Sequence, residues 1–173
     1  NEEKQTLVLT SLLHDITKEE YAIDKAHPTE SSFDAYYILE KLNLPKQQHM
    51  DIYQLIKNHD LLEHCNKGPM DPTTGKRLPI PEDEQDKKIK RYAYELRSGN
   101  IGELALMLTK ADLLGVTRDG SFFDKYGKAL DKVGNKLRNE IKTVKSTAIP
   151  LPQTKIPNAS KLIADDENVK EIT

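Results

Sequence analysis

The chain has 173 residues, with 26 Lys and Arg against 28 Asp and Glu, for a formal net charge of −2. This balance provides no strong overall field for nucleic acid or an anionic membrane, so a nucleic-acid partner stays possible but is not indicated. The chain carries one cysteine, which excludes an internal disulfide framework and favours a reducing compartment, so we expect a cytoplasmic protein. No apolar run approaches the roughly 18 residues of a membrane span, so we expect no membrane partner.

Apolar residues recur with helical spacing along most of the chain, which predicts an all-α fold. In the first helix, for example, Leu9, Leu12, Leu13 and Ile16 follow an i, i+3, i+4, i+7 pattern. The segment His27-Pro28-Thr29 is typical of a helix entry, with Thr29 as the expected cap. The expected helices cover about residues 4–17, 29–42, 45–59, 89–97, 101–116 and 126–144.

Two segments depart from this helical pattern. Residues 66–84 are rich in Pro and Gly, and a loop of that length is usually functional, so we expect a mobile lid or specificity loop beside the site. Residues 149–173 are polar, with several prolines at their start, and we expect a linker or an extended arm there. The predicted organisation is therefore a helical domain over residues 1–148 with a long last helix, followed by a Pro-rich tail.

Polar residues on apolar helical faces are the candidate functional groups. His14 and Asp15 end the first predicted helix, His59 lies on the apolar stripe of the third, and Asp112 follows Leu108 by four residues in the fifth. Burying a carboxylate or an imidazole in such a position costs free energy unless the group is paired or bound to metal. Each has a plain structural alternative: a polar helix end, a core histidine, or a salt bridge to a neighbouring helix.

The residues that carry these groups resemble a known family. Residues 12–18 (Leu-Leu-His-Asp-Ile-Thr-Lys) are similar to the signature of the HD-domain metal-dependent phosphohydrolase superfamily. His27, residues 52–59 (Ile-Tyr-Gln-Leu-Ile-Lys-Asn-His) and residues 109–113 (Thr-Lys-Ala-Asp-Leu) follow in the order seen in HD domains of bacterial tRNA nucleotidyltransferases and nitrogen-regulator uridylyltransferases. The resemblance covers about residues 5 to 118.

The resemblance implies a helical bundle with a His/Asp metal centre that hydrolyses a nucleotide or another phosphate ester. Lys18 would hold a substrate phosphate and so counts as both catalytic and substrate-binding. Its alternative is a solvated side chain at a helix end. His27 and His59 would bind a second ion or contact phosphate, so that His27 also counts as substrate-binding and His59 as catalytic. The mixture of oxygen and nitrogen ligands suits Mn, Fe, Co, Ni or Zn and would tolerate Mg. The expected metal ligands are His14, Asp15, His27, His59 and Asp112.

Two features differ from the family pattern. The family also takes a metal-binding His from a helix upstream of the His-Asp pair, and residues 1–13 contain none. We therefore expect a further N-terminal segment or a neighbouring domain to pack on the first helix and to cover its leucines. In addition, Thr17 stands where the family usually has Gly.

These features leave two functions open. The first is a metal-dependent phosphohydrolase or phosphodiesterase, which the misplaced His59 and Asp112 favour. The second is a non-catalytic HD-derived module that scaffolds or regulates a neighbouring domain, which the missing upstream His and the long last helix favour. The substrate itself is not readable from the sequence, because related sites share ligands and differ in their pocket walls.

Overall fold

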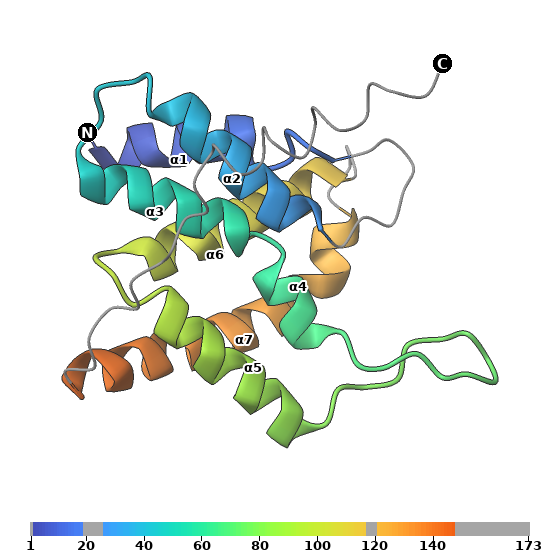
Figure 1. Ribbon diagram of the computed structural model, residues 1–173. Helices are drawn as coiled ribbons and strands as arrows, with labels where there is room; N and C mark the ends of the chain where they lie inside the picture. Colours follow the sequence, from blue (N-terminus) through green and yellow to red (C-terminus); the bar gives the residue numbers. More distant parts are fainter. Residues whose placement is uncertain (1, 19–25, 117–120, 148–173) are drawn as a thin grey trace, which may run out of the picture.

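The computed structural model describes residues 2–18, 26–116 and 121–147, and this part of the chain is helical (Figure 1). Within these ranges the prediction of an all-α fold is confirmed, with one isolated antiparallel bridge between Met70 and Arg77 as the only β-type pairing. None of the described helices is long and apolar enough to cross a membrane. The helices are α1 (Glu2–Leu13), α2 (His27–Leu39), α3 (Lys46–Lys57), α4 (Leu61–Asn66), α5 (Glu82–Glu95), α6 (Ile101–Val116) and α7 (Ser121–Ser146).

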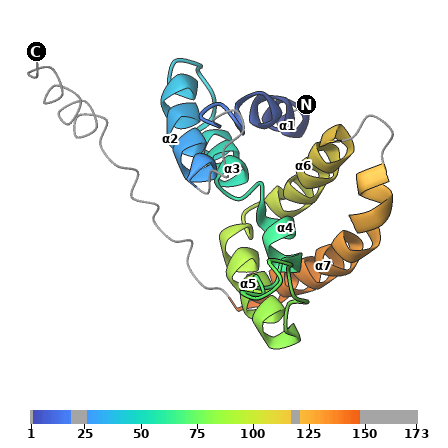
Figure 2. The ribbon, with the colours of Figure 1, turned by 90° about the vertical axis from the view of Figure 1, so that its right-hand side faces the viewer.

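The helices form two groups, α1 to α3 in one and α4 to α7 in the other; Figure 2 shows α1 to α3 above α4, α5 and α7. Ile52 and Ile56 of α3 pack with α2, and Leu9 and Leu13 of α1 complete that cluster. Leu55, on the other side of α3, belongs to the larger core formed with α4 to α7. Helix α3 therefore joins the two groups because its apolar residues point in both directions.

Helix α7 has the periodic apolar stripe that the sequence predicts. Leu130, Val133, Leu137 and Ile141 are buried in the larger core. Tyr126, the first residue of the predicted stripe, is instead exposed. The helix also begins earlier than predicted, at Ser121, and the expected linker beyond residue 149 lies outside the described residues.

Several helix ends differ from the predictions, and the differences place site residues in turns. Helix α1 stops at Leu13, so His14 and Asp15 lie in the turn that follows. Helix α2 begins at His27 with no side-chain cap, so the prediction that Thr29 caps it is wrong. His59 follows α3 rather than belonging to it, because α3 ends at Lys57 and α4 begins two residues after His59.

The predicted break at 66–84 is present between α4 and α5, and it contains a hydrogen-bonded turn. Asp71 accepts hydrogen bonds from the backbone of Thr73 and Thr74, and Gly75 takes a positive φ of 65° that other residues rarely adopt. The Leu78 amide donates to the Pro69 carbonyl at 2.9 Å and closes the hairpin. In Figure 1 this hairpin extends outward beyond α4 and α5, which is not the position of a lid over α1 and α2.

The leucines of α1 do not share one environment. Leu9 and Leu13 pack against the α2–α3 cluster, so they do have a partner within the described chain. Leu12 points away from it and is 72% exposed. The expectation that all three leucines lack a partner within the chain is therefore wrong for Leu9 and Leu13.

Candidate metal centre

Four separate segments meet at one place in the molecule: the turn after α1, the start of α2, the turn between α3 and α4, and the C-terminal half of α6. The first supplies His14 and Asp15, the next two supply His27 and His59, and α6 supplies Asp112. The structure thus brings all five predicted ligands into one neighbourhood.

The centre of this neighbourhood is a triangle of three ligand atoms. Asp15 Oδ1 lies 3.3 Å from His27 Nε2 and 3.3 Å from His59 Nε2, and the two Nε2 atoms are 3.2 Å apart. Both histidines are buried, with His59 only 4% exposed. These three residues lie close enough together to hold a metal ion.

The edges of the triangle match the spacing around a transition-metal ion. Bonds of about 2.1 Å with angles of about 90° to 109° would place neighbouring ligand atoms about 3.0–3.4 Å apart. The three observed edges fall within that range. The chemistry of the donors also fits, since two imidazole nitrogens and one carboxylate oxygen are typical ligands for such ions.

Two buried atoms of the neighbourhood lack a hydrogen-bond partner within the described chain: His14 Nε2 and Asp15 Oδ1. Buried polar atoms are normally satisfied, and an unsatisfied one in a native structure often marks a missing water or ion. Asp15 Oδ1 is also a corner of the triangle, so the unsatisfied acceptor lies where a cation would sit. A cation placed there would satisfy this acceptor, and this argument does not depend on the spacing of the ligand atoms.

The ring of His59 is oriented for metal binding by its surroundings. Its Nδ1 lies 2.8 Å from the Ile56 carbonyl, which can only accept, so Nδ1 carries the proton and the neutral ring presents the Nε2 lone pair to the triangle. Burial lowers the pKa of His59, which favours this neutral form. The backbone is held as well, because Thr109 of α6 donates its hydroxyl to the His59 carbonyl at 3.1 Å.

His14 and Asp112 form the outer side of the neighbourhood. His14 Nε2 lies 3.8 Å from Asp112 Oδ1 and 3.6 Å from Asp15 Oδ2, while its Nδ1 donates to the Ser11 carbonyl. The interaction with Asp112 raises the pKa of His14 against the opposing effect of burial, and the same contact lowers the pKa of Asp112. A positive charge, carried by a proton or a metal ion, is therefore favoured between these side chains.

The position of Asp112 corrects one part of the sequence interpretation. The helical pattern placed this carboxylate on a buried face, yet its side chain is 46% exposed. It lies at the outer edge of the centre, where water and a ligand can reach it, because α6 presents Leu113 rather than Asp112 to the core. The argument that burial forces Asp112 to have a partner therefore does not hold, although its contact with His14 remains.

Lys18 does not stand free as a phosphate-binding cation. Its Nζ lies 2.7 Å from Asp15 Oδ2, and this ion pair raises the pKa of Lys18. The side chain is half exposed, so the pair is accessible to solvent and of the kind that contributes little to stability. Lys18 thus neutralises the oxygen of Asp15 that faces away from the triangle.

Thr17 connects the turn after α1 to the start of α2. Its hydroxyl donates to the His27 carbonyl at 3.3 Å and forms a second hydrogen bond with the Ser31 hydroxyl at 2.9 Å. The Thr17 amide also donates to Ser31 Oγ at 3.2 Å. These bonds fasten the turn that carries Asp15 to the first turn of α2, which carries His27.

Sequence reasoning missed one member of the centre, Asp60. Its Oδ1 lies 3.6 Å from His59 Nε2 and its Oδ2 lies 3.9 Å from His27 Nε2, so it faces both histidines of the triangle. The available signal was a second His-Asp dipeptide, His59-Asp60, which repeats the pattern of His14-Asp15. With Asp60 the neighbourhood holds three carboxylates, an excess of negative charge that a divalent ion would balance.

Comparisons with known proteins add no assignment. No protein-family model, no curated protein and no solved structure matches this chain.

Proposed function

We propose that this protein is a metal-dependent phosphohydrolase or phosphodiesterase of the HD type, acting on a nucleotide or another phosphate ester. The observation that carries the proposal is the triangle of Asp15, His27 and His59, whose edges of 3.2–3.3 Å suit a transition-metal ion. Its proximity to His14 and Asp112 adds further nitrogen and oxygen ligands. This ligand set favours Mn, Fe, Co, Ni or Zn and tolerates Mg.

Asp15 is suited to bridge two ligand groups. Its Oδ1 faces His27 and His59, while its Oδ2 lies on the side of His14. One ion would be held by Asp15, His27 and His59, and His14 with Asp112 would bind a second. A bound divalent ion supplies Lewis-acid polarisation of a phosphoryl oxygen and makes a neighbouring water more acidic.

Lys18 would orient the substrate, and the ligands Asp112 and His59 are placed to act beside it. Lys18 is half exposed, so its ammonium would be able to turn from Asp15 to a phosphate oxygen of the substrate. Asp112, exposed at the outer edge, is reachable by a phosphate ester from solvent. His59 keeps its proton on Nδ1 through the Ile56 carbonyl, so its Nε2 stays available as a ligand throughout.

The test is hydrolysis of bis(p-nitrophenyl) phosphate and p-nitrophenyl phosphate by metal-stripped protein to which Mn²⁺, Co²⁺ or Mg²⁺ is returned. We expect activity to require the metal and to fall about 100-fold or more in Asp112→Asn and His59→Ala. The matched control is Asp83→Asn, an exposed carboxylate of α5 far from the centre in sequence.

Circular dichroism must show that the variants are folded, since His59 is buried. The proposal would be contradicted if hydrolysis continued after a chelator had removed the metal. Equal hydrolysis rates in Asp112→Asn and Asp83→Asn would also contradict it. Loss of stability in His59→Ala with unchanged activity per folded molecule would make His59 a core histidine.

The second candidate, a non-catalytic module that supports a neighbouring domain, has one observation in its favour. Val8, Leu12 and Ile16 are spaced four residues apart and are each about half exposed or more. Such an apolar stripe on α1 and the turn after it is suited to contact another segment. A protein that binds metal, shows no metal-dependent hydrolysis and associates through Leu12 would fit this candidate.

A further inference from the structure

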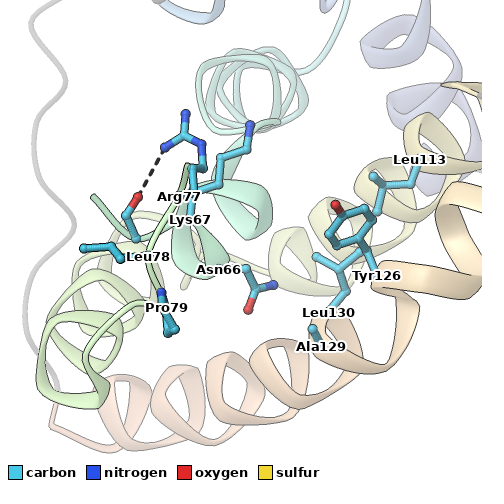
Figure 3. A pocket seen from close by; sticks show the side chains of 10 residues that line it. Asn66, Lys67, Arg77, Leu78, Pro79, Leu113, Tyr126, Ala129 and Leu130 are labelled. Carbon is cyan, nitrogen blue, oxygen red and sulfur yellow. Dashed lines mark hydrogen bonds between the residues drawn. The ribbon is translucent and has the colours of Figure 1, made fainter. Parts of the chain in front are cut away.

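A cavity of about 480 Å³ lies between the base of the 67–81 hairpin and helices α6 and α7. Figure 3 shows its two sides: Lys67, Arg77 and Leu78 come from the hairpin, and Leu113, Tyr126 and Leu130 face them from the helices. Its volume is in the range of small-molecule binding sites. None of the metal-centre residues lines it, so the cavity is a separate feature.

The helical side of the cavity is apolar and contains one aromatic ring. Leu113 and Leu130 are buried in the main core and form the apolar wall of the cavity. The ring of Tyr126 stands beside them in Figure 3 and is partly exposed although it belongs to the predicted apolar stripe of α7. An exposed aromatic ring next to an apolar wall is suited to a flat or apolar group of a ligand.

The hairpin side brings two cations together. In Figure 3 the side chains of Lys67 and Arg77 run in the same direction at the rim of the cavity. The pKa of Lys67 is lowered by burial and, second, by the charge of Arg77, so the two cations oppose each other. Arg77 is held by a hydrogen bond from Nη1 to the Gly68 carbonyl at 3.3 Å. An anion at this rim would relieve the repulsion between the two cations.

The backbone at the base of the hairpin is tightly packed, and this packing fixes the position of the rim. A Cβ added at Gly68 would lie 2.2 Å from the Leu78 carbonyl oxygen and 2.8 Å from the Ile80 amide nitrogen. Only glycine therefore allows the two arms of the hairpin to approach this closely. This close approach places Lys67 and Arg77 next to each other, although nine residues lie between them in the sequence.

The cavity adjoins the metal centre through two residues. Leu113 of the apolar wall directly follows Asp112 in α6. The carboxylate of Asp60, which faces His27 and His59, also acts electrostatically on Lys67. A ligand in the cavity would thus extend from a site beside the proposed metal ions.

We propose that this cavity is a binding site for an organic anion of the nucleotide class, with its ring system against Tyr126 and the apolar wall and a phosphate between Lys67 and Arg77. The combination of an aromatic apolar wall with two cations at one end matches a ligand that has a flat body and a compact anionic group. Inorganic phosphate would leave the apolar wall unused. That such a ligand is also the substrate rests on the proposed hydrolase function, whereas the binding itself does not.

The experiment uses the complete chain, treated with chelator, and ADP carrying a fluorescent N-methylanthraniloyl group as the probe. Fluorescence anisotropy should report binding without metal, and unlabelled ADP should compete much better than adenosine or inorganic phosphate. The double variant Lys67→Ala/Arg77→Ala should raise the Kd about tenfold or more. Lys76→Ala is the matched control because it removes an exposed cation from the same hairpin outside the cavity lining.

A second variant tests the apolar part without changing charge. Ala129 of α7 lines the cavity and is exposed, so Ala129→Trp should fill the space, keep the fold and abolish probe binding. Equal Kd values for the double variant and Lys76→Ala, or unchanged binding in Ala129→Trp, would overturn the proposal. If inorganic phosphate competed as strongly as ADP, the site would recognise only the anionic group. That result would also overturn the proposal of a nucleotide-class ligand.

The two proposals can fail separately. Asp15→Asn should bind the probe as the wild type does, because Asp15 is not part of the cavity lining. Metal-dependent hydrolysis by a wild-type protein that does not bind the probe would refute the cavity site alone. Probe binding with the expected variant pattern, but without any hydrolysis, would refute the proposed enzyme alone.

Discussion

A divalent metal ion should stabilise the folded protein, and Asp15 should be required for this effect. Asp15 contributes the one carboxylate oxygen of the ligand triangle, at 3.3 Å from both imidazole nitrogens. Its Oδ1 is buried and lacks a hydrogen-bond partner within the described residues. The substitution Asp15→Asn keeps the volume of the side chain and removes the charge that a metal ion needs.

The size of the effect follows from mass action. A ligand that binds only the folded state at 100 times its Kd adds about 2.7 kcal/mol to the free energy of unfolding. For a domain of this length, that gain raises the midpoint of thermal unfolding by roughly 5–10 °C. Without metal, Asp15→Asn loses chiefly the ion pair with the half-exposed Lys18, a pair of the kind worth about 0–1 kcal/mol.

The assay is thermal unfolding followed by circular dichroism, with metal-free protein and with Mn²⁺ at 100 times its measured Kd. The wild type should show the full increase of the midpoint, and Asp15→Asn should show almost none at the same Mn²⁺ concentration. Asp34→Asn, an exposed carboxylate of α2, is the matched control and should behave as the wild type. An equal metal-induced shift in Asp15→Asn and the wild type would refute the assignment of Asp15 as a ligand.

Three further predictions concern the packing that supports the centre. Burial raises the pKa of the Cys65 thiol from 9.0 to about 12, so iodoacetamide at pH 8 should modify native protein far more slowly than unfolded protein; equal rates would mean an open thiol. Because the pKa of the Cys65 thiol is higher in the folded than in the unfolded protein, the free energy of unfolding should fall as the pH rises from about 9 to 12. Ile52→Ala should lower the free energy of unfolding by about 2–5 kcal/mol in denaturant titrations, since Ile52 is fully buried, while Leu12→Ala should change it by less than about 0.5 kcal/mol. Thr109→Val removes the hydrogen bond to the His59 carbonyl and should cost about 1 kcal/mol and weaken metal binding measured by titration calorimetry; wild-type metal affinity would show that this bond does not position His59.

Local periodicity in the sequence was sufficient to predict where most helices lie. The predicted helix over 101–116 agrees with α6, and the predicted stripe of α7 contains four buried residues in the main core. This works because a helix that buries one face must repeat its apolar residues every three to four positions. The same reasoning singled out His59 and Asp112, because a polar group on an apolar helical face interrupts that repeat.

Helix ends and the exposure of single residues were not predictable in this way. His59 was expected inside a helix, yet it lies in a turn that depends on its hydrogen bonds to Ile56 and from Thr109. Asp112 was expected to be buried and is half exposed, because the packing of neighbouring helices decides which side of a stripe faces solvent. Periodicity describes one helix at a time, whereas these properties depend on the elements packed against it.

The sequence by itself thus determined the helical class, most of the apolar faces and the candidate ligands. Only the tertiary structure brought Asp15, His27 and His59 into one triangle, placed Asp60 beside it, and formed the cavity between Lys67, Arg77 and α7. The physical reason is that most of these contacts join residues of different helices or turns, such as His27 and His59, which are 32 positions apart. Such contacts are set by how the two groups of helices pack around α3 and by the close approach of the hairpin arms at Gly68, which no local pattern records.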